Sequence, residues 1–252
     1  MNAVVDAPIS TNEDTPAWTA EQAIGQIAVN LPGATAVFRR LKLDFCCGGQ
    51  ISLRQAVQDK NLELASVARE LNALSRSDAL PDAPNPSTLI DHILTRYHAV
   101  HREQLPELIR MARRVEAVHR DNPEVPVGLA DLLERAESEL LEHMEKEETV
   151  LFPALKSGAA AMAAYPMLVI REEHTSHGEM LDELMALTHD AVPPSGACNT
   201  WRALYAGIGQ LGDDLINHIH LENNVLFPQF ESAAPAAAAS GCGTGGGCGC
   251  AG

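Results

Sequence analysis

Two segments of the chain each carry a histidine and, four residues later, a glutamate. The segments read HMEKEETVLFP and HIHLENNVLFP, and their pairs are His143 with Glu147 and His218 with Glu222. Residues four apart lie on one face of a helix, so each segment directs an imidazole and a carboxylate at one point. One such pair is common on solvated helices. Two pairs in register before the same Val-Leu-Phe-Pro tail indicate two halves of a metal site.

The elements that must position these groups are four long helices. Apolar residues recur at helical spacing over residues 88–119, 126–150, 167–189 and 201–225. Few aromatic residues and many Ala, Leu and Glu residues also favour helix over sheet. The expected fold is therefore all-α, with a C-terminal up-down-up-down four-helix bundle and a small N-terminal helical domain.

Polar residues interrupt the apolar stripe of each bundle helix, about nine to thirteen residues from the same end of the bundle. At about 1.5 Å of rise per residue, these groups fall into one layer roughly 13 to 20 Å from that end. A carboxylate buried without a partner is unstable in its charged form, so metal is the expected partner. The six predicted ligands are His98, His143, Glu147, His174, His218 and Glu222.

Four imidazoles and two carboxylates exceed the ligand set of a mononuclear zinc or iron site. They suit two metal ions, each held by two histidines, with the two glutamates bridging. Mixed nitrogen and oxygen ligation favours iron or manganese over calcium, and iron is the predicted metal.

Other polar residues near the predicted ligands have less certain roles from spacing alone. His101 and His177 each lie three residues after a predicted ligand and share its stripe. Each is left open as a ligand, a proton relay or a neighbour of the site. Glu145 and Glu148 lie off the face of the ligands and are predicted to be solvated, while Glu173 is left unassigned.

Composition divides the chain into five predicted segments. They are a disordered tail (1–17), a small helical domain (18–75), a linker (76–87), the bundle (88–232) and a Gly/Ala/Cys-rich tail (233–252). In the small domain, Thr19 and Gln22 indicate a capping box, and a second helix is expected from Ala34 to Leu43. The C-terminal tail is left open as a flexible end or an accessory segment for thiol or metal chemistry.

Cys46 and Cys47 are the candidate functional cysteines of the small domain. They precede Gly48 and Gly49, which predict a turn that exposes them. Adjacent cysteines can bind soft metal or nitric oxide, or form a strained disulfide. The alternative is that both are small buried apolar side chains. We hypothesise a thiol or redox role for the pair.

Charge and hydropathy exclude several classes of partner. The formal net charge of -16 argues against a nucleic acid or an anionic membrane as partner, because both are bound through Lys and Arg. The sequence begins without a signal peptide pattern, and no apolar run approaches the roughly twenty residues that span a bilayer. The prediction is a soluble, cytoplasmic protein with reduced cysteines.

The bundle region resembles the hemerythrin-like domain. The motifs RYHAVHREQLPEL, HMEKE, EEH and HIHLE, preceded by DFCCGG, are together similar to the bacterial repair-of-iron-centres family, also called regulators of cell morphogenesis and nitric oxide signalling. The resemblance covers about residues 18–230. Position by position, it implies the same six ligands that the periodicity selects and a non-haem di-iron centre with an oxo bridge. It also implies that Cys46 and Cys47 match the paired cysteines of the family.

The resemblance implies restoration of iron-sulfur clusters damaged by nitrosative or oxidative stress, through iron delivery or nitric oxide removal. The expected partners are damaged iron-sulfur proteins, with nitric oxide or oxygen species as small ligands, and a homodimer is among the expected assemblies. Two alternatives are a nitric-oxide-binding buffer or sensor, and a redox enzyme that reduces nitric oxide or peroxide. His174 and His177 are three apart, not four as in oxygen-carrying hemerythrins, which argues against reversible oxygen carriage.

Overall fold

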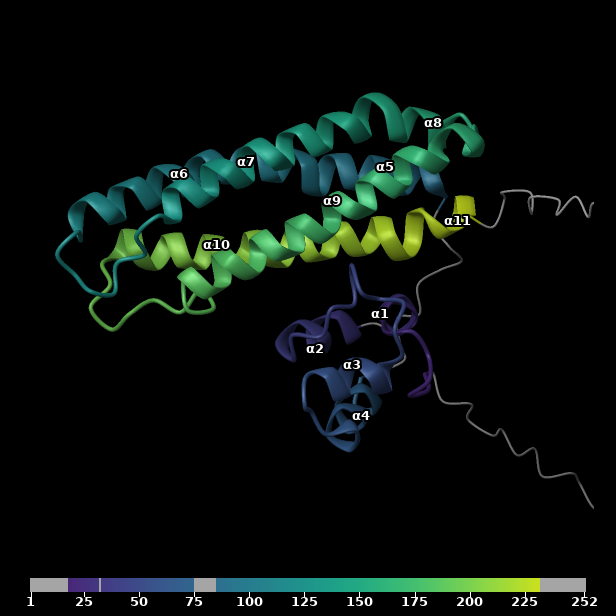
Figure 1. The fold of residues 1–252 in the computed structure, drawn as a ribbon, viewed down its shortest axis with the longest axis horizontal. Coiled ribbons are helices and arrows are strands. Elements are labelled where there is room, and N and C mark those ends of the chain that lie inside the picture. Colours follow the sequence, from purple (N-terminus) through teal and green to yellow (C-terminus); the bar gives the residue numbers. More distant parts are fainter. Residues whose placement is uncertain (1–17, 32, 75–84, 232–252) are drawn as a thin grey trace, which may run out of the picture.

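The computed structural model describes residues 18–31, 33–74 and 85–231, and most of these residues are helical (Figure 1). Within those ranges β-pairing is limited to one isolated bridge between Ala23 and Ser52. The all-α prediction is therefore confirmed. None of the described helices is long and apolar enough to cross a membrane.

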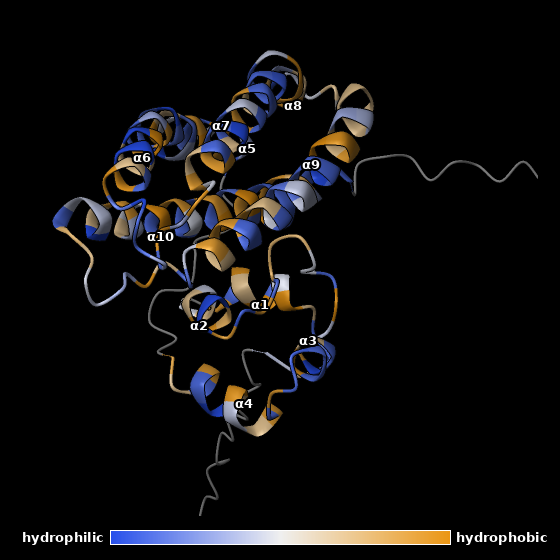
Figure 2. Cartoon of the chain, turned by 60° about the vertical axis from the view of Figure 1, so that its left-hand side comes forward, coloured by the Kyte–Doolittle hydropathy of each residue, from blue (hydrophilic) through white to orange (hydrophobic). Residues whose placement is uncertain are grey.

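Four long helical rods form the C-terminal bundle. Their segments are α5 (Pro86–Ile93), η2 (Leu94–His98) and α6 (Ala99–Val118); α7 (Leu129–Lys146), η3 (Glu147–Leu151) and α8 (Phe152–Lys156); α9 (Ala160–Leu187); and α10 (Asn199–His220), η4 (Leu221–Leu226) and α11 (Pro228–Glu231). The α6 and α9 rods each pack against both α7 and α10, so they occupy opposite corners of the bundle. Each long helix carries hydrophilic and hydrophobic residues, as expected for helices with one buried face (Figure 2).

The predicted helix boundaries differ from the observed ones mainly at α9. This helix begins at Ala160, seven residues before the predicted start at Met167. Pro166 lies inside the helix, where it removes one backbone donor without ending the helix. At the start of the bundle, Pro86 occupies the first turn of α5, and the Asn85 side chain accepts a hydrogen bond from Ser87 N at 2.8 Å.

The bundle core consists of two apolar clusters with a polar layer between them. The cluster nearer α5 contains Leu89, Ile90, Ile93, Leu151, Phe152, Leu155, Ala163, Met167, Ile170, Leu226 and Phe227. The larger cluster begins at Leu105 on α6 and extends past Leu133 and Trp201 toward the opposite end. The histidines and glutamates of the predicted site lie between these clusters, where apolar packing on both sides limits access of water.

The small N-terminal domain contains α1 (Ile24–Asn30), α2 (Ala34–Arg40), α3 (Leu53–Asp59) and α4 (Leu64–Asn72), and it has an apolar cluster of its own. The predicted capping box is wrong, because α1 starts after Ala23 without a side-chain cap. Thr19 accepts a hydrogen bond from Gln22 N through its backbone carbonyl only. The second helix ends at Arg40 and not at Leu43, because Lys42 adopts a positive φ of 53°.

The small domain packs against the C-terminal part of the bundle, beneath α10 in Figure 1. Helix α1 contacts η4, and Arg39 pairs with Asp213 of α10 at 3.3 Å. The predicted tails, most of the predicted linker and the cysteines beyond residue 231 lie outside the described residues, while α5 begins inside the predicted linker.

Candidate metal centre

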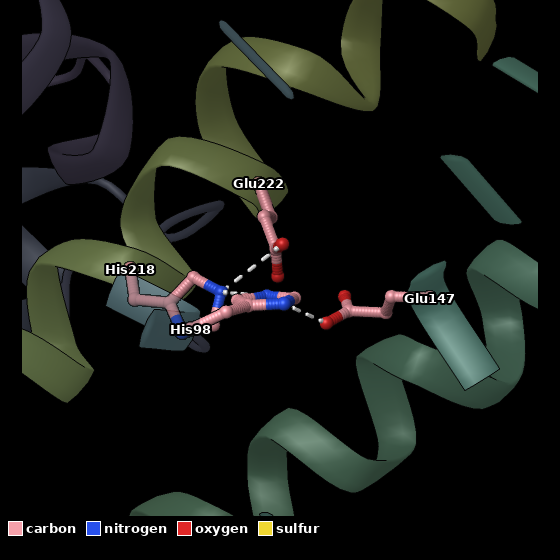
Figure 3. A group of neighbouring side chains, drawn as sticks. All are labelled: His98, Glu147, His218 and Glu222. Carbon is pink, nitrogen blue, oxygen red and sulfur yellow. Dashed lines mark hydrogen bonds and ion pairs between the residues drawn. The ribbon is translucent and has the colours of Figure 1, made fainter. Parts of the chain in front are cut away.

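The six side chains predicted as ligands point into one buried layer between the four helical rods. All six are at most 2 % exposed. Their potential donor atoms fall into two groups, each of which lies within 4.8 Å: His98, Glu147, His218 and Glu222, and His143, Glu147, His174 and Glu222. Figure 3 shows the first group, in which dashed lines join His98 to Glu147 and to His218, and His218 to Glu222. Both glutamates belong to both groups, so the arrangement suggests a di-metal site.

In the first group the imidazole nitrogens lie close to each other and to the carboxylates. His98 Nε2 lies 3.2 Å from His218 Nε2 and 3.3 Å from Glu147 Oε2. His218 Nε2 lies 3.2 Å from Glu222 Oε1. Four donor atoms from three different rods therefore converge where a single cation could contact all of them.

The second group repeats this arrangement with the other two imidazoles. His143 Nε2 lies 3.4 Å from Glu147 Oε2, and His174 Nε2 lies 2.9 Å from Glu222 Oε2. Glu147 places the same oxygen, Oε2, near a histidine of each group, whereas Glu222 places one oxygen near each group. Both arrangements are expected of a bridging carboxylate.

The two glutamates are the strongest sign that a cation belongs in this layer. Both are fully buried, and neither oxygen of Glu147 or Glu222 has a hydrogen-bond partner among the described residues. Burial and the adjacent Glu222 carboxylate raise the pKa of Glu147 well above its usual range. Burial opposes ionisation of Glu222 as well, but the imidazoles of His218 and His174 outweigh it and lower its pKa. Paired cations between the carboxylates would stabilise both as anions.

His98 and His143 are held in the neutral form that binds metal. Burial lowers the pKa of His98 to about 4, and it lowers the pKa of His143 to about 4 despite the hydrogen bond to Glu173. Both imidazoles are therefore uncharged at neutral pH, with a nitrogen free to coordinate.

Carboxylates outside the layer orient two of these imidazoles. His98 Nδ1 lies 2.7 Å from Glu148 Oε1, which also pairs with Arg102 at 2.8 Å. His143 Nδ1 lies 2.8 Å from Glu173 Oε2. A carboxylate on Nδ1 fixes that nitrogen as the donor and leaves Nε2 directed at the site. The prediction that Glu148 is solvated is only partly right, because its side chain is 31% exposed but also contacts His98 and Arg102 on the neighbouring rod.

Three of the four rods form a π-helical turn at the site. In η3 the Phe152 N–H donates to the Glu147 carbonyl, and in η4 the Phe227 N–H donates to the Glu222 carbonyl at 2.9 Å. The prolines that follow, Pro153 and Pro228, have no N–H with which to continue the α-helical pattern. Wider turns of this kind are frequent at functional sites.

Sequence reasoning missed these turns, although the Phe-Pro end of each repeat was a signal for them. The extra residue in the π-helical turn changes which of the residues after the turn face the core. Val150, predicted on the apolar stripe, is 54 % exposed, whereas Leu151 is fully buried.

The loop between α2 and α3 brings Cys46 and Cys47 against the bundle. Their sulfurs are 3.7 Å apart, and both cysteines are half-buried and free. Cys47 Sγ donates to the backbone carbonyl of His174 at 3.3 Å, while Asp44 accepts from Cys47 N at 2.9 Å. The neighbouring Cys47 thiol and burial raise the pKa of Cys46 above its usual value. The pair therefore lies beside a predicted ligand, partly covered and not fully exposed as the Gly-Gly turn suggested.

Two asparagines of η4 join this loop to the metal layer. Asn223 Oδ1 lies 2.9 Å from His174 Nδ1, and Asn223 Nδ2 donates to the Cys46 carbonyl at 3.1 Å. Asn224 Nδ2 donates to the Phe45 carbonyl at 3.1 Å. One amide thus links a predicted ligand to the cysteine loop, a connection that the sequence alone did not reveal.

His101 and His177 are buried next to the layer but belong to neither group of donor atoms. Burial lowers the pKa of each to about 3. Within the described part of the chain, neither nitrogen of His101 has a hydrogen-bond partner, and Nδ1 of His177 has none.

Comparison with known proteins identifies the family of each of the two domains. Residues 89–230 match the family described as Hemerythrin HHE cation binding domain, and residues 20–75 match ScdA_N, described as a domain of unknown function. The chain is 46% identical to the probable iron-sulfur cluster repair protein of Haemophilus influenzae, over 83% of this chain and 96% of that protein. It is 49% and 46% identical to the iron-sulfur cluster repair proteins YtfE of Cronobacter sakazakii and Escherichia coli O157:H7, with the same coverage. The chain therefore belongs to the YtfE-type iron-sulfur cluster repair protein family, in which an ScdA_N domain precedes a hemerythrin domain.

Proposed function

We propose that the protein repairs iron-sulfur clusters damaged by nitrosative or oxidative stress and that it holds two non-haem iron ions. The observation that carries the proposal is the pair of fully buried glutamates shared by two His-rich groups. The names of the relatives support cluster repair as the role of this site. Damaged iron-sulfur proteins are the proposed clients, and nitric oxide or oxygen species the proposed small ligands.

In this proposal each iron has two histidines of its own and shares both glutamates. His98 and His218 would hold one ion, and His143 and His174 would hold the other. The mixed nitrogen and oxygen donors suit iron, and an oxo bridge would complete the link between the ions. When bound, the iron pair supplies redox chemistry and an affinity for nitric oxide, or serves as iron to be delivered.

The chain's own residues shield this site from water and fix the orientation of its imidazoles. Glu148 and Glu173 hold the rings of His98 and His143 by their Nδ1 atoms, so Nε2 faces the layer without rearrangement. Apolar clusters on both sides restrict water. Cys46 and Cys47, beside His174, are proposed to receive nitric oxide or ferrous iron on its way between the layer and a client.

Reconstitution of a damaged enzyme tests the proposal. The iron-loaded protein is incubated with an iron-sulfur enzyme inactivated by nitric oxide, and both the recovered activity and the iron lost from this protein are measured. We expect recovery with the wild-type protein and none with Glu222→Leu. Recovery that is equally good with the Glu222→Leu protein would contradict a role for this site in repair.

One observation favours a second function, a redox enzyme that reduces nitric oxide or peroxide. The free thiols of Cys46 and Cys47 lie 3.7 Å apart beside the metal layer, where a dithiol could supply two electrons by forming a disulfide. Steady consumption of nitric oxide or peroxide in the presence of a thiol reductant would favour this enzyme. Binding that stops at a stoichiometric amount would exclude it.

A further inference from the structure

Two buried histidines lie one helical turn beyond the predicted ligands and have no evident role in holding the ions. His101 follows His98 by three residues on α6, and His177 follows His174 by three residues on α9. They are 0% and 3% exposed. Among the described residues, both nitrogens of His101 and Nδ1 of His177 lack a hydrogen-bond partner.

The two rings are divided between the two halves of the site. The His101 ring centre lies 5.5 Å from that of His218, in the half that also contains His98. The His177 ring meets His143 edge-on at 4.7 Å, in the other half. Because α6 and α9 occupy opposite corners of the bundle, each half of the layer has one additional imidazole on its own side.

An imidazole without partners is an unfavourable residue at such a position. A buried polar group without a hydrogen-bond partner is less favourable than an apolar side chain of similar shape. The neighbouring core positions on the same two helices, Leu105 and Leu184, are filled by leucine. These observations indicate that His101 and His177 have a partner that the described residues do not supply.

Direct metal coordination is not the best account of these two residues. Neither belongs to the groups of donor atoms that lie within 4.8 Å of one another. Each group already offers two imidazoles and two carboxylates, which leaves coordination positions open on an iron ion. A small molecule in such a position would lie in the same dry layer as the additional imidazole.

We propose that His101 and His177 form a binding site for a small exogenous ligand, one imidazole in each half of the layer. Each donates a hydrogen bond to a small acceptor molecule, of the class that includes azide and nitric oxide, at the open position of the adjacent iron. This inference rests on the proposed di-iron site. It assigns the two imidazoles to ligand binding and selection, not to holding iron.

Azide titration of the full-length, oxidised, iron-loaded protein tests the inference. The dissociation constant is read from visible absorption, and iron content is measured separately for each protein. We expect His101→Leu and His177→Leu to retain two irons and to bind azide about 10- to 100-fold more weakly, the effect of one lost hydrogen bond to a charged ligand. His101→Gln and His177→Gln keep a donor and should recover part of the affinity. His92→Leu, at an exposed position, is the matched control and should behave as wild type.

The infrared stretching band of bound azide gives a readout that packing alone would not move. If an imidazole N–H donates a hydrogen bond to the bound azide, the azide band of the wild-type protein should shift in D2O. The leucine variants should not show this shift. Unchanged azide affinity and an unchanged band in both leucine variants would overturn the inference. Loss of iron from either leucine variant would also overturn it, by making that histidine a ligand. A wild-type protein that never holds two irons would instead refute the proposed site itself.

Discussion

The two His-x-x-x-Glu segments place the same ligands in the same geometry but have different surroundings. Glu147 and Glu222 are both fully buried, and both begin or lie within a π turn that ends before Phe-Pro. After Glu147 comes Glu148, a partly exposed carboxylate paired with Arg102. After Glu222 comes Asn223, a buried amide that contacts the cysteine loop. The chemistry of the layer is therefore symmetric, while one side adjoins solvent and the other adjoins the small domain.

Removing either shared carboxylate should have the largest effect, and the same effect on both halves. We expect Glu147→Leu and Glu222→Leu each to lose iron without unfolding, because leucine is tolerated in a buried stripe while the link between the ions is gone. Iron analysis and circular dichroism measure the two outcomes. Glu145→Leu, at an exposed position two residues from His143, should keep both irons. Iron retained by Glu147→Leu but lost by Glu145→Leu would show that the ligands are assigned wrongly.

The side of the layer that adjoins the small domain can be tested through its cysteines. Cys46→Ser with Cys47→Ser should leave the iron content and the absorption bands unchanged, because neither residue belongs to the six-ligand layer. Serine neither binds ferrous iron nor receives nitric oxide as a thiol does, so repair should fall strongly. The assay of cluster recovery measures this loss. Full repair by the double variant would show that both cysteines contribute to packing and not to repair.

Acid should affect both halves alike. Burial lowers the pKa of several histidines in the folded state: His98, His101, His143, His177 and His220. The unfolded chain, with a usual histidine pKa of about 6.5, then binds more protons. The free energy of unfolding of the metal-free protein should therefore fall as pH is lowered from about 6.5 toward 4. The raised pKa of Glu147 acts in the opposite direction but is outnumbered. Urea titrations at several pH values measure the trend, and a flat profile would contradict burial of neutral imidazoles.

The smallest expected effects come from substituting the residues that orient His174 and His98, and they should distinguish the side of the layer next to the small domain from the side next to solvent. Asn223→Ala removes the partner of His174 Nδ1 and the contact to the Cys46 carbonyl, so iron affinity should fall about tenfold and the cysteines should be alkylated faster. Glu148→Gln weakens the hold on His98 and the pair with Arg102 but leaves the cysteine loop unchanged, so we expect a similar change in iron affinity and unchanged alkylation. Equal alkylation rates in both variants would remove the proposed link between the layer and the cysteine loop.

Periodicity was sufficient to predict the bundle and the convergence of six polar side chains in one layer, because helical spacing decides which residues face a core. It could not predict the partners of the imidazoles. Glu148 lies off the core face yet reaches a neighbouring rod, and a single helix pattern does not distinguish such a contact from solvent. The π turns and the docking of Asn223 on the cysteine loop depend on hydrogen bonds that have no period in sequence.

The most direct test of the central claim is metal analysis of the full-length protein produced with abundant iron. Two irons per chain are predicted, because Glu147 and Glu222 each belong to two groups of donor atoms. One iron per chain, or zinc retained in place of iron under these conditions, would contradict the dinuclear site.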